Sequence, residues 1–437
     1  NNPSRSWEDQ IGTRKPFRFG MSDSRHASKQ HYTSFRRPFH TKLFYFVLSV
    51  GLAGGLTWLL GGVDLNREQY YILYLVFFAM TLWLTEAIPP FAVGLFIISY
   101  LVYTQGTGIF SDHPQDVSKY VNTWSSPVIW MMLGGFFMAE GLHKTNWDKF
   151  IFQLTLRIYG THPPYLLLGL MLSTAFSSMV MSNTATTALM IASVMPFLKS
   201  LGVQHTFSKA VLLGIPTAAS LGGMGTVIGS PPNAIAVGVL ESHGIALDFL
   251  SWMFFGVPLG IGLLLFFWLV LCLRYSLFGR KLQADALSES PLFTSLKVEF
   301  QSFWVLFTLL LTLSLWLTTV WHGLSVAVIS AIPIVFLTMS GLIRSEDVRK
   351  LPWDTLMLVA GGLALGLAIS ESGLAQYYIE RVHLGDMKGN NYFLLFFFAY
   401  LTMIGSNFMS NTATSTIFLP IAFILSAAQS LELALII

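Results

Sequence analysis

The feature that most constrains this chain is a series of eight long stretches without Asp, Glu, Lys or Arg. They cover residues 43–63, 87–110, 120–139, 158–198, 210–240, 249–273, 301–343 and 389–431. A helix that crosses a bilayer needs about 20 apolar residues. Only 11% of the residues are charged, against roughly 25% in an ordinary soluble domain. The sequence therefore predicts an all-α polytopic membrane protein in a lipid bilayer.

The N-terminal arm, residues 1–42, is basic. It holds nine Lys and Arg against three Asp and Glu, so its net charge is 9 − 3 = +6. Basic residues that flank a first span stay on the cytoplasmic side, which predicts a cytoplasmic N-terminus; a transit peptide is the alternative. Met21 is a candidate first residue. The single cysteine, Cys272, allows no intrachain disulfide framework.

Several stretches are expected to be simple spans. A loop is expected near 111–126, and a helix from Val128 into the 140s. Other helices are predicted near 43–61, 70–88, 91–105, 252–273, 301–320 and 323–343.

The stretch 158–198 has a different design, because a dense polar patch lies at its middle. Ser182-Asn183-Thr184 is the centre of that patch, and Ser173, Thr174 and Ser177-Ser178 precede it. Lipid cannot satisfy the N–H and C=O groups of a non-helical turn, so such a turn must be covered by protein or line a wet cavity. We therefore expect a re-entrant hairpin of two helical arms.

The next stretch, 210–240, is expected to be a broken helix. Glycines cluster at 222–225, and Gly229-Ser230-Pro231-Pro232-Asn233 follows. Consecutive prolines remove two backbone donors and glycine tolerates unusual φ angles. Free carbonyl groups are therefore expected near 225–230.

The second half of the chain repeats this design. Ser-Asn-Thr-Ala-Thr occurs at 182–186 and again at 410–414; a Gly-Gly pair precedes it by 48 residues in the first case (Gly134-Gly135) and by 49 in the second (Gly361-Gly362). Each Gly-Gly pair is followed by a Gly-Leu pair and an amphipathic segment. Duplication, often with inverted halves, is typical of transporters. We expect a basic arm at 1–42, a first repeat within 43–275, a linker at 276–300 and a second repeat at 301–437.

The two Ser-Asn-Thr triplets have the chemistry of an ion and anion site. Their hydroxyl and amide groups can donate and accept without carrying charge. Amides at the start of the following helix favour an anion, whereas unwound carbonyls favour Na+. The structural alternative, helix packing through small polar residues, is preferred for Ser173, Thr174 and Ser177.

Other polar residues are assigned less specific roles. Glu86, at the end of a span, is more consistent with a structural position than with a proton relay, and Glu140 and Glu371 are placed near helix ends. The histidines lack metal-site spacing. No Walker loop is found, so direct ATP coupling is not supported.

These motifs together resemble the divalent anion/sodium symporter family, sodium-coupled dicarboxylate transporter type. The segments that carry the resemblance are Trp83–Pro89, Gly134-Gly135, Ser182–Thr184, Gly222–Asn233, Pro352–Thr355 with Gly361-Gly362, and Ser410–Thr412. It spans about residues 43–437. The resemblance implies a homodimer in a bacterial inner (plasma) membrane, with a scaffold domain and a transport domain that moves as an elevator.

The resemblance also implies site residues. A first Na+ site would use Ser178, Ser182, Asn183 and the Gly229 carbonyl group. A second would use Ser406, the Met409 backbone and Asn411. Substrate carboxylates would be bound by Asn183, Thr184, Ser230, Ser410, Asn411 and Thr412.

One departure from the family pattern concerns the C-terminal side. A second broken helix is expected about 40 residues after Asn411, yet the sequence as given ends at Ile437. The expectation is therefore a second repeat that is C-terminally incomplete.

The function expected is secondary active transport of a di- or tricarboxylate of the succinate or malate type with Na+, and no enzymatic activity. A sulfate carrier or dicarboxylate exchanger of the same fold stays open, because neutral triplets do not set the distance between two anionic groups. An anion channel is the alternative from another class, since re-entrant loops also occur in pores. An intramembrane enzyme is disfavoured, because no His or acid adjoins either triplet.

Overall fold

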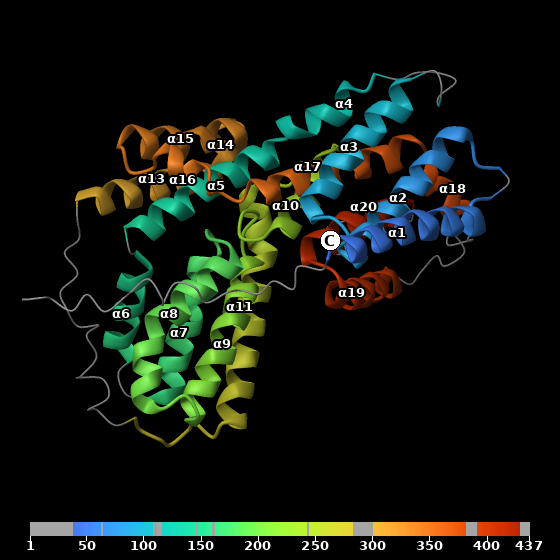
Figure 1. Cartoon of the computed structure of the whole chain (residues 1–437). Helices are drawn as coiled ribbons and strands as arrows, with labels where there is room; N and C mark the ends of the chain where they lie inside the picture. The colour runs from blue at the N-terminus through green and yellow to red at the C-terminus, as the bar shows by residue number, and fades with distance from the viewer. Residues whose placement is uncertain are drawn as a thin grey trace, which may run out of the picture.

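The computed structural model describes residues 38–428 except 63, 108–109, 111–115, 146, 160–161, 243, 283–299 and 382–390. Within those residues the regular structure is helical and no strand occurs (Figure 1). Residues 1–37 of the basic arm and most of the linker expected at 276–300 lie outside the described residues. An all-α architecture is confirmed for the part described.

The helices follow the expected order along the chain. They are α1 (Phe39–Leu60), α2 (Arg67–Thr85), α3 (Pro90–Gly106), α4 (Ser118–Val121), the 3-10 turn η1 (Asn122–Ser125), α5 (Pro127–Lys144), α6 (Trp147–Tyr159), α7 (Pro163–Ser178), α8 (Asn183–Leu201), α9 (Thr206–Gly223), α10 (Pro231–Ser242), α11 (Phe249–Arg274), α13 (Phe300–Leu317), α14 (Thr319–His322), α15 (Val326–Met339), α16 (Ser345–Val348), α17 (Trp353–Glu371), α18 (Leu374–Arg381), α19 (Asn391–Phe408) and α20 (Asn411–Ala428).

Four of these helices are long and apolar enough to cross a membrane by length and composition, namely α1, α8, α11 and α17. Their surroundings differ: 67% of the apolar window of α17 is buried inside the protein, against 17% for α1. Helix α17 is therefore an internal helix, while α1 presents most of its surface outward. Two details differ from expectation, because α4 and η1 lie within the loop expected at 111–126, and α14 separates α13 from α15.

Both triplets lie at tight helix-to-helix turns. Helix α7 ends at Ser178 and α8 begins at Asn183, while α19 ends at Phe408 and α20 begins at Asn411. At each turn a serine hydroxyl caps the second helix: Ser182 Oγ accepts from Ala185 N–H at 3.3 Å, and Ser410 Oγ from Ala413 N–H at 3.1 Å. The cap satisfies one of the free amides at a helix start, which explains why serine leads each triplet.

The interruption expected in the stretch 210–240 is present. Helix α9 ends at Gly223 and α10 begins at Pro231, so residues 224–230, here called the break, separate them. The prolines occupy the first positions of α10, where a missing N–H costs least. The break is mostly buried, with Val227 only 1% exposed.

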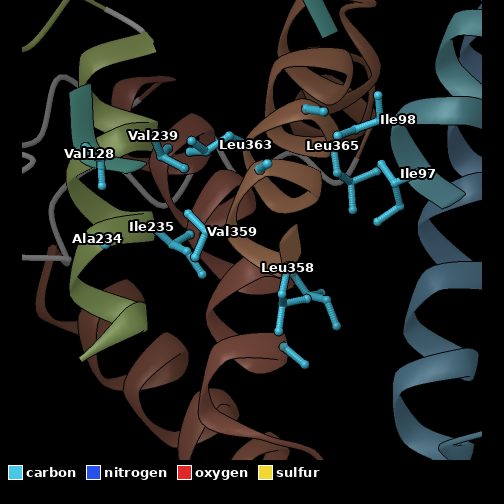
Figure 2. Close-up of a cluster of buried hydrophobic side chains, with 14 of the residues drawn as sticks. Ile97, Ile98, Val128, Ala234, Ile235, Val239, Leu358, Val359, Leu363 and Leu365 are labelled. Atoms are coloured by element: carbon cyan, nitrogen blue, oxygen red, sulfur yellow. The ribbon is translucent and has the colours of Figure 1, made fainter. Parts of the chain in front are cut away.

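The core is divided between two groups of helices. One cluster of buried side chains joins α7, α8, α9 and α11, which form the lower bundle in Figure 1. A larger cluster joins α2, α3, α10, α17 and α20 with their neighbours. Figure 2 shows part of it, where Ile97 and Ile98 of α3 face Leu365 of α17, and Ile235 of α10 faces Val359. The break carries the chain from the first group to the second.

The Gly-Gly pairs that indicated a repeat occupy comparable close contacts. Helix α17 packs extensively on α3, and α5 on α15. A Cβ atom on Gly361 would overlap the Gly94 backbone, and one on Gly134 would lie 3.0 Å from the Ser330 carbonyl oxygen. Each helix with a Gly-Gly pair thus contacts a helix of the other half through the first of its two glycines.

Candidate functional site

The Asn183 amide is the centre of the candidate site. It lies on the first residue of α8, where it faces both the end of α7 and the break. Its inner amide atom is 2.8 Å from Ser178 Oγ, and the same position lies 3.3 Å from the Gly229 carbonyl oxygen and 3.2 Å from that of Ala219. Three elements therefore bring oxygen atoms to one side chain.

The two possible orientations of the Asn183 amide make different hydrogen bonds. With its nitrogen inward, it donates to the oxygens of Ser178, Gly229 and Ala219. With its oxygen inward, it accepts from Ser178 but faces two carbonyl oxygens, which is unfavourable unless a cation lies among them. Hydroxyl, amide and unwound carbonyl oxygens suit Na+. The nitrogen-inward orientation therefore satisfies all three oxygens of the cluster in the absence of a cation.

Glycines allow the break to approach Asn183 this closely. A Cβ atom on Gly223 would overlap the Asn183 amide, and one on Gly229 would lie 2.6 Å from the Gly223 carbonyl oxygen. Ser178 is fully buried at 0% exposure. A larger residue at position 223 would push the end of α9 away from Asn183, and one at position 229 would push the break away from the end of α9. Both glycines are therefore required for close packing.

The residues expected to bind substrate beside this cluster are more open. Thr184 is exposed, and Asn183 and Ser230 are half-buried; Ser182, which is expected at the Na+ site, is also exposed. The Ser182 hydroxyl uses an acceptor site for the cap and keeps its O–H to donate. At the start of α8 the backbone amides and the helix dipole favour an anion. The open face of the tip can thus hold a carboxylate without a buried cationic side chain.

The second triplet is arranged differently. Asn411 and Ser410 are exposed, and the Ser406 hydroxyl donates to the Met403 carbonyl oxygen within α19 at 3.0 Å. The Met409 N–H donates to Gly405 in the same helix at 3.0 Å. Helix α20, which begins at the triplet, packs against α10 and α17. The second tip is thus joined to the helix that follows the break.

The structure brings part of the expected site together. Ser178, Asn183 and the Gly229 carbonyl group meet, whereas Ser182 caps its own helix. Among the described residues, the Ser406 hydroxyl and the Met409 N–H bond to carbonyl groups of α19 and do not form a comparable cluster with Asn411, so the second Na+ site stays a prediction. The Ala219 carbonyl group was missed, because a carbonyl inside a helix leaves no mark in the sequence.

Charged residues outside the triplets form structural ion pairs. Glu371, at the end of α17, pairs with Lys119 of α4, and Lys144, at the end of α5, pairs with Asp347 of α16. The Lys144 ammonium also donates to the Leu342 carbonyl oxygen at 2.9 Å. These pairs tie helix ends to connecting segments. In the described part of the chain, no group of three or more His, Cys, Asp and Glu is placed to hold a metal ion.

Comparison with known proteins matches residues 80–437 to the family described as citrate transporter. The chain belongs to this transporter family. A sodium-dependent dicarboxylate transporter, SdcS, of Staphylococcus saprophyticus is 31% identical over 409 residues, which cover 84% of this chain and 75% of that protein. The SdcS proteins of Staphylococcus aureus strains RF122 and USA300 are 31% identical over 438 residues, which cover 92% of this chain and 82% of theirs.

Membership in the citrate transporter family confirms the resemblance to divalent anion/sodium symporters. It also confirms an integral membrane transporter, in agreement with the apolar helices. The relatives named are bacterial proteins. The orientation of the N-terminus stays a prediction.

Proposed function

We propose that this protein is a secondary active transporter that moves a dicarboxylate of the succinate or malate type together with Na+. The observation that carries the proposal is the convergence of Ser178 Oγ and the Ala219 and Gly229 carbonyl oxygens on the Asn183 amide. Na+ is the co-transported ion, bound among these oxygens. The names of the SdcS relatives support the same cation and the same substrate class.

The Asn183 amide couples the cation to the anion. When its oxygen turns toward Na+, its NH2 group turns outward and can donate to a substrate carboxylate. Thr184 and the first amides of α8 complete the donors on this side. Ser230 extends the set, and Ser410, Asn411 and Thr412 bind from the second tip. Substrate affinity therefore rises with Na+ concentration.

Transport proceeds by an elevator motion within a homodimer. The separate buried cores of α7–α9 with α11 and of the larger group support relative motion of two bodies. The reciprocal packing of α17 on α3 and of α5 on α15 supports two inverted repeats with re-entrant hairpins. The outward-facing apolar surface of helices such as α1 contacts the lipid of the bilayer.

Two alternatives keep specific support. A sulfate carrier or a dicarboxylate exchanger fits the same uncharged donors, because a single helix tip binds one anionic group at a time. An anion channel fits a pair of re-entrant tips at mid-membrane. Saturable uptake with countertransport distinguishes a carrier from a channel, whose signature is unitary current.

Uptake by purified protein in proteoliposomes tests the proposal. Radiolabelled succinate should accumulate in the presence of external Na+, and unlabelled malate should compete better than sulfate. Citrate measures whether tricarboxylates are accepted. Accumulation of labelled sulfate without accumulation of labelled succinate would replace the dicarboxylate assignment, and uptake that needs internal dicarboxylate but no Na+ would indicate an exchanger.

A further inference from the structure

Three carbonyl groups of the break and its edge are occupied by side-chain donors. The Asn233 Nδ2 donates to the Gly223 carbonyl oxygen and to that of Thr226, each at 2.8 Å. The Trp252 Nε1 of α11 donates to the Met224 carbonyl oxygen at 3.0 Å. The carbonyl groups at the end of a helix lack partners within that helix. Without these side-chain donors, their oxygens would be available to bind a cation.

Asn233 is placed for this role by the start of α10. It is 8% exposed and follows the two prolines, and its own N–H donates to the Ser230 carbonyl oxygen at 3.1 Å. An amide buried among apolar side chains is costly unless its hydrogens are used. The contacts to residues 223 and 226 use both hydrogens of the Asn233 amide, so it bridges the two ends of the first turn of the break.

Trp252 reaches the break because α11 lies very close to the end of α9. A Cβ atom on Gly256 would lie 2.5 Å from the Met224 carbonyl oxygen, and one on Gly260 would lie 2.8 Å from that of Leu221. These glycines let α11 cover the carbonyl end of α9. The indole N–H then supplies a donor to the carbonyl group of Met224, the residue that follows α9.

The break is also fastened to the first helix tip. The Thr226 hydroxyl donates to the Met179 carbonyl oxygen and accepts from the Gly229 N–H, the latter at 3.1 Å. This contact sets the position of Gly229 relative to the turn that precedes Asn183. The Gly229 carbonyl oxygen is thereby directed at the Asn183 amide, while those of 223, 224 and 226 point at other donors.

We infer that Asn233 and Trp252 are positioning residues for the cation: they hold three carbonyl groups of the break out of reach and leave Gly229 to face Asn183. The inference rests on the proposed function, because it assigns residues to the proposed Na+ site. Neither side chain touches the ion. Their effect is on Na+ affinity and on selectivity between Na+ and Li+, since a loosened break offers carbonyl oxygens at other distances.

Thermal unfolding of the purified protein at increasing NaCl tests the inference, with choline chloride holding ionic strength constant. The stabilisation that raises Tm follows RT ln(1 + c/Kd), where c is the Na+ concentration, and the fitted Kd is the half-saturating Na+ concentration. The variant W252F removes the indole N–H and keeps an aromatic ring. The matched control is W268F in the same helix, whose Nε1 donates to the Pro164 carbonyl oxygen at 2.8 Å, far along α11 from the break.

We expect W252F to raise the half-saturating Na+ concentration about five-fold, as for the loss of one hydrogen bond, and to reduce the preference for Na+ over Li+. N233A should act in the same direction, and W268F should match the wild type. A wild type without Na+-specific stabilisation would contradict the proposed cation site itself. Normal stabilisation with equal values for W252F and W268F would overturn the inference alone. So would loss of folded protein in both W252F and N233A, which would make the two residues structural supports.

Discussion

The Asn183 amide lies 3.3 Å from the Gly229 carbonyl oxygen, although Asn183 begins α8 and Gly229 lies in the break that follows α9. Ser178 approaches the same amide from α7. In the proposed mechanism, the amide turns its oxygen inward when Na+ enters this cluster. The account of this protein as a Na+-coupled carrier depends on that change of orientation.

Removing the Ser178 hydroxyl should weaken Na+ binding specifically. We expect Ser178→Ala to raise the half-saturating Na+ concentration for uptake about ten-fold, because a contact to a charged group is worth at least ~1.4 kcal/mol. Uptake as a function of Na+ at saturating succinate measures it. Ser177→Ala is the control, since the Ser177 hydroxyl donates to its own helix at Ser173. Equal effects of both variants would argue against a ligand role for Ser178.

The second triplet should matter for transport and little for folding. Asn411 is exposed, so Asn411→Ala should change the unfolding free energy by less than about 0.5 kcal/mol. Succinate uptake should nevertheless fall at least ten-fold, because the amide is proposed to bind a carboxylate. Uptake and thermal unfolding are measured on the same preparation. Unchanged uptake would remove Asn411 from the proposed substrate site.

Close helix crossing makes Gly361 sensitive to a single methyl group. Gly361→Ala would force the added Cβ atom into the Gly94 backbone, and we expect a loss of about 1–3 kcal/mol of stability. Gly55→Ala on α1 is the matched control, because no atom lies within 4 Å of its added Cβ and alanine favours a helix. In thermal unfolding, Gly55→Ala should have a higher Tm than Gly361→Ala. A reversed order would contradict the crossing.

The ion pair at the end of α5 predicts a pH dependence. The Lys144 ammonium and the Arg344 N–H hold the pKa of Asp347 below its ordinary value. A lowered pKa in the folded state means that the Asp347 contribution is complete above the ordinary pKa of about 3.9 and is lost as pH falls through the lower, folded value. The Tm difference between wild type and Asp347→Asn should stay constant from neutral pH to about 5 and shrink below about 4. A difference that grows on acidification would contradict this sign.

Much of the fold was predictable, because hydrophobic stretches and their polar interruptions mark elements directly. The uncharged stretch with Ser182–Thr184 at its middle predicted α7, the turn and α8, and the consecutive prolines at 231 and 232 predicted the break. Local chemistry was sufficient there, since lipid leaves a polar turn few environments.

Contacts between distant segments were much less accessible. The Trp252 indole N–H donates to the Met224 carbonyl group, 28 residues away in the sequence. Lys144 and Asp347 are 203 residues apart. No periodic pattern in the sequence predicts such contacts, because they depend on how the chain folds in three dimensions. The glycines and prolines predicted free carbonyl groups near 225–230, and the family resemblance selected Gly229 among them, but neither indicated Ala219.

Na+-gradient-driven uptake tests the central claim most directly. Proteoliposomes with the wild type or with Ser178→Ala are given labelled succinate under an inward Na+ gradient, or with equal Na+ on both sides. The account predicts transient accumulation above equilibrium for the wild type under the gradient alone, and a much smaller overshoot for Ser178→Ala at the same Na+. Wild-type uptake that only reaches equilibrium, whether or not a Na+ gradient is present, would contradict it.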